Sequence, residues 1–353
     1  MKKFWLLSIL VPLFGVATSV RANDDQGALV LTASNATANQ LLVYNTSGGL
    51  LQTIPTQGQG GVSGNAGGIA VGGGLIAVVN FGSKNVSIFE SDGHAFQMTQ
   101  LIPAVSNPVS VAFGGDHLYI LGTTKVESHV IFGSHVNSNP DGVVSLLLAD
   151  GSAAQVGVVS LVAPNGPAAS ANGAQSQLIL TEKTGDIETV NLLPSGAASG
   201  TATLVQNIPA NPLAPFGLVT RGNDAYVTIA HSNEITLVRD DKVLTVTNSG
   251  TQNAPCWLTL DGVFLYSSNS PSMSISRYAV YGQKIVQDLA VAASLNGDPT
   301  DIAAAGGLLA VVDGNGPVSH LSTFSVDEDG NLTLMKAVTI SGAFNGVAVL
   351  NAR

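Results

Sequence analysis

The segment Gly68–Asn80, GIAVGGGLIAVVN, joins two short apolar runs through a glycine turn. The same pattern returns as VSVAFGGDHLYILG from Val109, AASANGAQSQLILTE from Ala168, GLVTRGNDAYVTIA from Gly217, WLTLDGVFLYSSN from Trp257 and DIAAAGGLLAVVD from Asp301. Short apolar runs between turn residues predict β-hairpins. Two of the turns, Asn172-Gly173 and Asp261-Gly262, are dipeptides that tight hairpins prefer because both central residues need a positive φ. The chain therefore repeats one hairpin.

A third strand with alternating polarity follows the hairpins. Examples are NVSIFES from Asn85, DIETVNL from Asp186, EITLVRD from Glu234 and SMSISRYAV from Ser272. A turn and a weaker fourth strand come next, as in LTLMKAV from Leu332. Four strands in a unit of about 40 to 45 residues are typical of a β-propeller blade.

Most units begin with proline or glycine just before the first strand. The starts are Gly67-Gly68, Asn107-Pro108, Gly166-Pro167, Ala214-Pro215, Ala254-Pro255 and Asp298-Pro299. Proline suits the first position of a strand because it cannot donate to the ladder. The interval from Pro108 to Pro167 is longer than the others, so we predict an insertion in the third blade, at the polar stretch 123–142.

The two ends of the chain complete one unit. The N-terminal unit contains GALVLTAS from Gly27, NQLLVYNT from Asn39 and LLQTIPT from Leu50 but lacks a first strand, and the C-terminus carries a spare strand, GVAVLNA from Gly346. Pairing them predicts an all-β, seven-bladed β-propeller of four-stranded antiparallel blades, one domain over 23–353. A β-sandwich or a stacked solenoid is the alternative, but neither explains the missing first strand and the spare last one.

The first 22 residues have the pattern of a secretory signal. Lys2 and Lys3 precede an apolar run, and Val20-Arg21-Ala22 ends in small residues, so we expect cleavage near Ala22 and export to the periplasm or the medium. An uncleaved anchor is the alternative, which Pro12 and the short run disfavour. No later segment is apolar enough to span a membrane.

Charge and cysteine content restrict the function further. Without the signal, 10 Lys and Arg face 23 Asp and Glu, which argues against nucleic acid or an anionic membrane as a partner. The single cysteine, Cys256, cannot form an intrachain disulfide, and we expect a buried apolar role for it rather than a nucleophile. No motif indicates a cofactor, and we expect a monomer.

Several strings resemble the lactonase-like propellers, which include bacterial 6-phosphogluconolactonase and fungal 3-carboxymuconate cyclase and are related to YVTN-repeat propellers. These strings are PFGLV from Pro215, PCWLTLDGVFLYSSNS from Pro255, DPTDIA from Asp298 and FNGVAVL from Phe344. The resemblance runs from about Gly27 to Leu350 and implies the seven-bladed fold and a lactone hydrolase. The catalytic members of this family share a histidine-rich stretch and arginines near the central channel.

The chain departs from that catalytic pattern. No His-x-His motif occurs, and the nearest group is Glu127, His129 and His135 in the predicted insertion, whose spacing matches no zinc motif. The arginines outside the signal are Arg221, Arg239, Arg277 and Arg353, and we predict that none lines the channel entry. The lysines Lys84, Lys125 and Lys183 remain as point charges for an anion.

The candidate site lies on the face where each second strand ends and each innermost strand begins, the channel-entry face. The residues just after the second strands are Asn80, Thr123, Glu182, His231, Asn269 and Asp313, joined by Asn35 in the first blade. They predict a ring of ligand-binding groups, with Glu182 and His231 as an acid–base pair. The alternative is that they cap strand ends and bond their own loops. Asp298, Asp301 and Asp313 offer oxygen ligands for calcium, but caps explain them equally.

Together these features favour an exported, non-catalytic propeller. We expect it to bind a small molecule or a protein through the channel-entry face and the third-blade insertion, where His129 and His135 are additional ligand-binding candidates. A lactone hydrolase that uses Glu182 and His231 is the alternative. A structural component of the envelope is a third reading.

Overall fold

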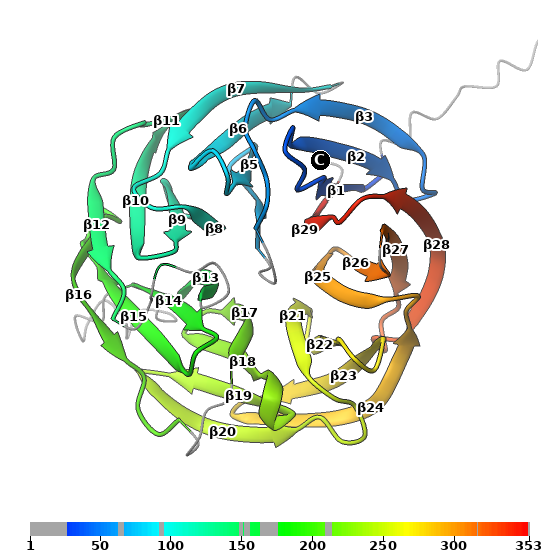
Figure 1. Cartoon of the computed structure of the whole chain (residues 1–353). Helices are drawn as coiled ribbons and strands as arrows, with labels where there is room; N and C mark the ends of the chain where they lie inside the picture. Colours follow the sequence, from blue (N-terminus) through cyan, green and yellow to red (C-terminus); the bar gives the residue numbers. More distant parts are fainter. Residues whose placement is uncertain are drawn as a thin grey trace, which may run out of the picture.

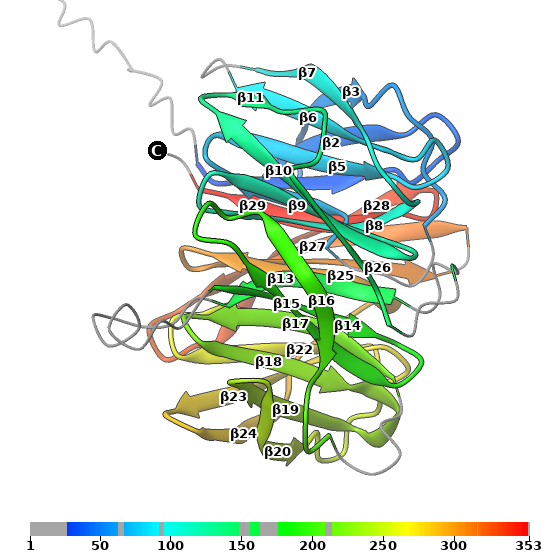
Figure 2. The ribbon, with the colours of Figure 1, turned by 90° about the vertical axis from the view of Figure 1, so that its left-hand side faces the viewer.

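A computed structural model describes residues 27–62, 67–91, 95–147, 151, 156–162, 176–208, 214–315 and 317–351. Seven antiparallel sheets surround a central axis as the blades of a propeller (Figure 1). Seen from the side, the strands run across the thickness of a disc (Figure 2). The all-β, seven-bladed fold predicted from the hairpin repeat is confirmed. None of the helices in the described ranges is long and apolar enough to cross a bilayer.

Each blade is numbered in chain order from the one that joins the two ends. The first contains β29 (Asn345–Leu350), β1 (Leu29–Ala33), β2 (Gln40–Asn45) and β3 (Leu50–Pro55). The second contains β4 (Ile69–Gly72), β5 (Leu75–Asn80), β6 (Asn85–Ser91) and β7 (Phe96–Pro103). The third contains β8 (Pro108–Gly114), β9 (His117–Gly122), β10 (Lys125–Phe132), β11 (His135–Val136) and β12 (Gly142–Ser145).

The remaining blades have four strands each. The fourth contains β13 (Val156–Val162), β14 (Gln177–Glu182), β15 (Asp186–Leu192) and β16 (Ala198–Leu204). The fifth contains β17 (Pro215–Arg221), β18 (Asp224–Ile229), β19 (Glu234–Arg239) and β20 (Lys242–Asn248), with the short 3₁₀ helix η1 (Ala230–Ser232) after β18. The sixth contains β21 (Pro255–Asp261), β22 (Phe264–Asn269), β23 (Ser274–Tyr281) and β24 (Lys284–Ser294). The seventh contains β25 (Asp298–Ala305), β26 (Leu308–Asn315), β27 (Val318–Val326) and β28 (Leu332–Ser341).

The ends of the chain close the ring as the sequence predicts. β29 pairs antiparallel with β1, with Leu29 opposite Leu350 and Thr32 opposite Val347. The Thr32 hydroxyl donates to the Gly346 carbonyl at 2.8 Å. Figure 1 shows the last strand beside the first. Since this pairing completes the first blade, the inner edge of β1 is covered by β29.

The core lies between the blades. Each blade covers the next one, so second strands such as β5, β9 and β18 are buried along their whole length. Two of the fully buried tyrosines lie in these interfaces, and their hydroxyls donate to backbone carbonyls of the following blade. Tyr119 donates to Gly196 at 2.9 Å, and Tyr266 donates to Gly330 at 2.8 Å. The phenols therefore join neighbouring blades without a buried unsatisfied donor.

The innermost strands begin irregularly at the channel-entry face. The register shifts after Pro108, Pro215, Pro255 and Pro299, each at the start of its strand. Proline removes a ladder donor, and the resulting bulge re-aims the side chain that follows it. Gly217 lies where two innermost strands approach closely, since a Cβ there would stand 2.5 Å from the Cys256 carbonyl oxygen.

The third and fourth blades differ from the sequence prediction. Stretch 123–142 is mostly strand rather than an inserted loop, because β10 is the regular third strand and β11 and β12 pair with different parts of it. The fourth blade begins at Val156 rather than at Pro167, since the apolar run VGVVSLV forms its innermost strand. The extra residues therefore fall between β13 and β14, where Gly166-Pro167 lies outside the described residues.

Candidate binding site at the channel entry

In four blades the second strand ends near a fully buried polar side chain. These strand-end residues are Asn80, Glu182, Asn269 and Asp313. Each stands opposite a third-strand residue: Asn85, Asp186, Ser274 and His320, respectively. The positions match the predicted ring, and the side-chain contacts show where each group is directed.

Asn80 uses both ends of its amide within the protein. Its Nδ2 donates to Asn85 Oδ1 at 2.9 Å and to Ser87 Oγ at 2.7 Å. Its Oδ1 accepts from Thr56 Oγ1 at 2.7 Å and from Asn39 Nδ2 at 3.0 Å. Thr56 and Asn39 belong to the connections of the first blade, so Asn80 joins the first and second blades.

Asn269 and Asp313 are held in the same way. Asn269 Nδ2 donates to Ser276 Oγ at 2.8 Å and to Ser274 Oγ at 3.1 Å, while its Oδ1 accepts from Ser267 Oγ. Asp313 Oδ1 lies 2.7 Å from His320 Nδ1, and Oδ2 accepts from the Asn296 backbone N–H. These groups are bonded within and between blades.

Glu182 occupies the equivalent position in the fourth blade, but its third-strand neighbour is a second carboxyl group, Glu188. Burial, followed by the charge of Glu188, raises the pKa of Glu182 to about 8. Glu188 Oε1 also accepts from the Leu147 N–H of the third blade at 2.8 Å. Two carboxyl groups in this position share a proton at neutral pH.

The two residues of the predicted acid–base pair differ in their exposure to solvent. Glu182 is fully buried, whereas His231 is exposed on η1, and its ring lies 6.0 Å from the Phe216 ring between centroids. No hydrogen bond joins Glu182 to His231 in the part of the chain that the structure describes.

The other histidine candidates lie away from the entry. His129 is fully buried on β10, with Nδ1 2.8 Å from the Asn137 carbonyl and Nε2 3.7 Å from Glu127. Both Glu127 oxygens accept the Val105 N–H. His135 lies on β11, a strand at the outer rim (Figure 1). Its Nδ1 is 2.9 Å from Gln100 Nε2.

The remaining candidates take part in backbone and side-chain contacts. The Thr123 N–H donates to the Asn107 carbonyl, and the Asn35 side chain accepts from Gly61 and Val62. Asp301 is buried on β25 and accepts from three backbone N–H groups. Within the described ranges, no group of three or more His, Cys, Asp or Glu side chains is arranged to hold a metal ion.

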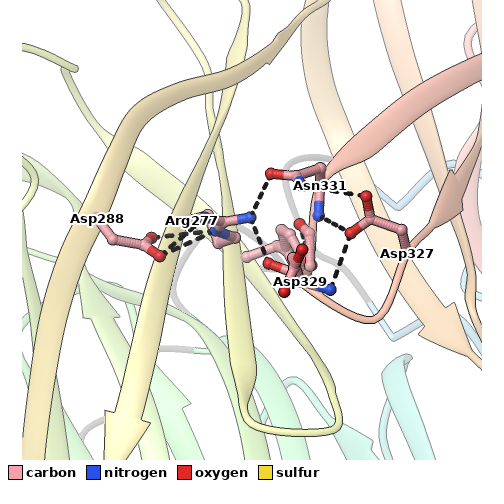
Figure 3. Close-up of polar contacts among 7 residues, drawn as sticks. Arg277, Asp288, Asp327, Asp329 and Asn331 are labelled. Carbon is pink, nitrogen blue, oxygen red and sulfur yellow. Dashed lines mark hydrogen bonds and ion pairs between the residues drawn. The ribbon is translucent and has the colours of Figure 1, made fainter.

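Arg277 joins the sixth and seventh blades through its hydrogen bonds (Figure 3). Its Nε and Nη2 donate to Asp288, with Nη2 2.9 Å from Oδ2, while Nη1 donates to the Asp329 carbonyl and to Asn331 Oδ1. The guanidinium also lies over the Phe264 ring. Arg239 pairs with Asp224 at 2.6 Å, and Arg221 donates to the Gly262 carbonyl; Arg353 is outside the described residues.

Lys183, Phe216, His231 and Trp257 form a group at the channel entry, which we call the entry cluster. The Lys183 Nζ lies 5.4 Å from the Phe216 ring centroid, and the Trp257 ring centroid lies 5.5 Å from that of Phe216. Trp257 is buried, while Lys183 and Phe216 are partly exposed. The residues come from the fourth, fifth and sixth blades.

Local sequence explains the cluster. Phe216 follows Pro215 at the bulge that opens β17, and Cys256 has the same place after Pro255 in β21. Burial lowers the pKa of Lys183 to about 8 and raises the pKa of the Cys256 thiol to about 11. An amine and an imidazole beside an aromatic face can bind a small anion with a flat body. Sequence reasoning missed Phe216 and Trp257, although their positions after the strand-opening prolines were visible.

Solved structures similar to this chain share its fold. A candidate 6-phosphogluconolactonase from Bacteroides fragilis matches with a TM-score of 0.65 and 15% identity, covering 93% of this chain and 99% of that one. A protein from Lactobacillus plantarum matches with a TM-score of 0.67 and 15% identity, covering 92% and 99%. Virginiamycin B lyase from Staphylococcus aureus matches with a TM-score of 0.55 and 15% identity, covering 82% and 92%. No family model matches the sequence, and no curated protein matches it significantly. The chain is a seven-bladed β-propeller with the fold of candidate lactonase-like propellers.

Proposed function

We propose that the chain is an exported, non-catalytic propeller that binds a small anionic ligand with a flat apolar body through the entry cluster. The observation that carries this proposal is the placement of the Lys183 ammonium group and the His231 ring around Phe216. The polar strand-end residues, in contrast, are bonded within and between the blades. Ligand recognition therefore depends on the cluster rather than on the ring predicted from the sequence.

The chemistry of the cluster supports this class of ligand. A carboxylate or phosphate accepts hydrogen bonds from a lysine ammonium group, and the opposite charges of the two groups strengthen these hydrogen bonds. A ring stacks on Phe216, an arrangement that aromatic pairs favour. Burial disfavours the charged ammonium form of Lys183 and lowers its pKa. A bound anion stabilises that charged form.

Lactone hydrolysis is the second candidate function, and one contact favours it. Asp313 Oδ1 lies 2.7 Å from His320 Nδ1. A carboxylate in this position orients a histidine that acts as a general base. The His320 side chain is 15% exposed and the carboxylate is fully buried. Asp313 and His320 thus join Glu182 and His231 as residues to test for turnover.

Trp257 provides a direct measurement of ligand binding. The chain has two tryptophans, Trp5 and Trp257, so a full-length Trp5→Phe variant leaves a single reporter 5.5 Å from the Phe216 ring. Benzoate, phthalate and phenyl phosphate are titrated while Trp257 fluorescence is followed, with benzyl alcohol as the uncharged control. We expect saturable quenching by the anions only.

Variants identify the site. Phe216→Ala should weaken binding at least about fivefold, and Lys183→Met about tenfold. Lys125→Met is the matched control, because Lys125 follows the second strand of the third blade and bonds Ser145. Unchanged affinity in both cluster variants would contradict the proposal.

The same protein is assayed on a panel of lactones that includes 6-phosphogluconolactone. We expect no turnover above the uncatalysed rate. Turnover that is lost in His320→Gln and Asp313→Asn, or in His231→Ala and Glu182→Gln, would establish the hydrolase instead.

A further inference from the structure

We infer that Lys84, Lys125 and Lys183 form a lysine arc over three consecutive blades, which binds a strand of an acidic polysaccharide built from uronic-acid units. The inference goes beyond the proposed function, because it adds a binding surface beside the entry cluster. It rests on that function only through Lys183, which belongs to both. It adds that the ligand is a chain, of which a small ring-shaped anion resembles one unit.

The three lysines occupy equivalent places in the second, third and fourth blades. Lys84 directly precedes β6, Lys125 is the first residue of β10, and Lys183 directly follows β14. Each therefore lies in or next to the connection from the second strand to the third, on the channel-entry face. Figure 1 shows these three blades side by side around the ring. One ammonium group per blade thus follows the curve of the entry face.

The contacts of these side chains leave the arc open to solvent. Lys84 is exposed, and Lys125 is partly exposed, with its Nζ donating to the Ser145 hydroxyl at 3.0 Å. Lys183 is partly exposed as well, and its Nζ lies 5.4 Å from the ring centroid of Phe216. A hydroxyl and an aromatic ring are uncharged, so neither of these two contacts cancels the positive charge of its lysine.

The connections from second to third strands carry basic residues without acidic ones. In sequence, they contain Lys84, Lys183 and His231 but no Asp or Glu. The seven connections are residues 34–39, 81–84, 123–124, 183–185, 230–233, 270–273 and 316–317. The whole chain, in contrast, has 23 Asp and Glu against 13 Lys and Arg. This part of the entry face is therefore more basic than the chain as a whole.

The carboxyl groups closest in sequence to the arc are withdrawn from solvent. Glu127 and Glu182 are buried, and burial, followed by a neighbouring carboxyl group, raises the pKa of Glu182 to about 8. Asp186, the first residue of β15, is partly buried, and this burial raises the pKa of its carboxyl group. Glu234 and Asp298 begin strands of the fifth and seventh blades, outside the arc.

Acidic residues gather instead in the turns of the opposite face. The turns there that the structure describes contain no lysine or arginine, and they include Asp116, Asp240, Asp241, Asp327, Glu328 and Asp329. Strands such as β5, with six residues, separate the two faces by about 20 Å. Charges are screened beyond about 8 Å at physiological ionic strength. The acidic turns therefore do not keep an anion from the arc.

A uronic-acid chain matches both the arc and the aromatic ring beside it. It carries one carboxylate on each pyranose ring, so negative charge recurs along a strand that meets one lysine in each blade. Each ring also presents C–H groups that can lie on the partly exposed ring of Phe216, next to Lys183. A single exposed ion pair contributes little, but several on one chain act together, because the first contact raises the effective concentration of the next carboxylate.

Chain length provides the first measurement. Full-length protein is titrated by calorimetry with galacturonate, with hexagalacturonate and with the neutral maltohexaose. We expect hexagalacturonate to bind at least about tenfold more tightly than galacturonate and to lose affinity as salt is added, while maltohexaose does not bind. Equal affinity for the hexamer and the monomer would overturn the inference. Hexaglutamate binding as tightly as hexagalacturonate would overturn the assignment to a polysaccharide.

Two double variants that lose the same charge locate the surface. Lys84→Met/Lys125→Met should weaken hexagalacturonate binding at least about fivefold and leave galacturonate binding unchanged, because one unit occupies only the entry cluster. Lys242→Met/Lys284→Met is the matched control, since both lysines are exposed beside turns of the opposite face. Thermal unfolding verifies that each variant is folded. Equal effects of the two double variants on the hexamer would contradict the arc.

The benzoate titration of Trp257 separates this inference from the proposed function. Quenching by benzoate, together with equal affinity for hexagalacturonate and galacturonate, would refute the arc and leave the proposed function intact. Tight hexamer binding that depends on Lys84 and Lys125, without quenching by benzoate, would support the arc and refute the entry cluster as a site for small anions. Absence of both would refute the two together.

Discussion

Glu182 and Glu188 form a carboxyl pair at a position where other blades place an amide and a hydroxyl. Asn80 bonds Ser87 at 2.7 Å in the second blade, and Asn269 bonds Ser276 at 2.8 Å in the sixth. The strand register makes these three pairs equivalent. An amide–hydroxyl pair is stable at any pH, whereas two buried carboxyl groups need a proton between them. Among these three blades, the fourth is therefore the one in which this contact responds to pH.

The Glu182→Gln variant should be more stable than the wild type at alkaline pH. The folded-state pKa of Glu182 is raised from 4.5 to about 8, so its contribution to stability is fully present below about pH 4.5 and is lost as the pH rises towards 8. Glutamine keeps a neutral donor at all pH values. We expect a gain of about 1–2 kcal/mol in the free energy of unfolding at pH 8.5 and little change at pH 5. Urea unfolding at both pH values measures it, and a difference that is independent of pH would contradict the shared proton.

Asp301→Asn should loosen the closure of the ring. The Asp301 carboxylate accepts the N–H groups of Val347 on β29, Gly67 and Ile302, at 2.9, 3.2 and 2.8 Å. An amide nitrogen in place of one oxygen leaves an N–H without an acceptor, which costs about 1–3 kcal/mol. Hydrogen exchange of residues 345–350 should speed up. Asp298→Asn is the control, because Asp298 is exposed in the same strand.

The stability of the wild type should also depend on pH through Asp301. Burial raises the pKa of this carboxyl group from 3.8 to about 7. Its contribution is present below about pH 3.8 and is lost as the pH rises through 7. The difference between wild type and Asp301→Asn should therefore change between pH 5 and pH 8, and a constant difference would argue against titration of Asp301.

Arg277→Lys should destabilise the protein without changing the ligand site. Lysine cannot contact Asp288, the Asp329 carbonyl and Asn331 at once as the planar guanidinium does (Figure 3). We expect a loss of about 1–3 kcal/mol in thermal or urea unfolding and unchanged quenching of Trp257 by benzoate. Arg221→Lys, which removes fewer contacts, should cost less. Equal costs for the two variants would contradict this role.

Cys256 should react slowly with thiol reagents while the protein is folded. The side chain is 8% exposed, and burial raises its pKa to about 11. The thiolate is the reacting species, so at pH 8 we expect the rate with a disulfide reagent to be at least about a hundredfold below that of unfolded protein. Since this is the only thiol, the absorbance of the released reagent reports it directly. Fast reaction in native buffer would mean that Cys256 is accessible.

Sequence patterns located most of the blades because each one repeats the same local signals. Pro108, Pro215 and Pro255 open innermost strands as predicted, since proline tolerates the first ladder position. The predicted start of the fourth blade was wrong because Gly166-Pro167 has the same proline signal as the dipeptides that do open innermost strands. The run Val156–Val162 before it has the apolar character of an inner strand, and only pairing with β14 distinguishes the two.

The site shows what the sequence could and could not determine. The alternation of apolar runs and turns was sufficient to predict seven blades and the closure by β29, because hairpins and blade edges are determined by local backbone chemistry and by the need to pair free edges. The same patterns located Asn80, Asn269 and Asp313 at strand ends. Only the tertiary structure showed that these side chains bond within and between blades. It also brought Lys183, Phe216 and Trp257 together from three blades. Contacts between blades depend on packing across long sequence separations, which no local pattern records.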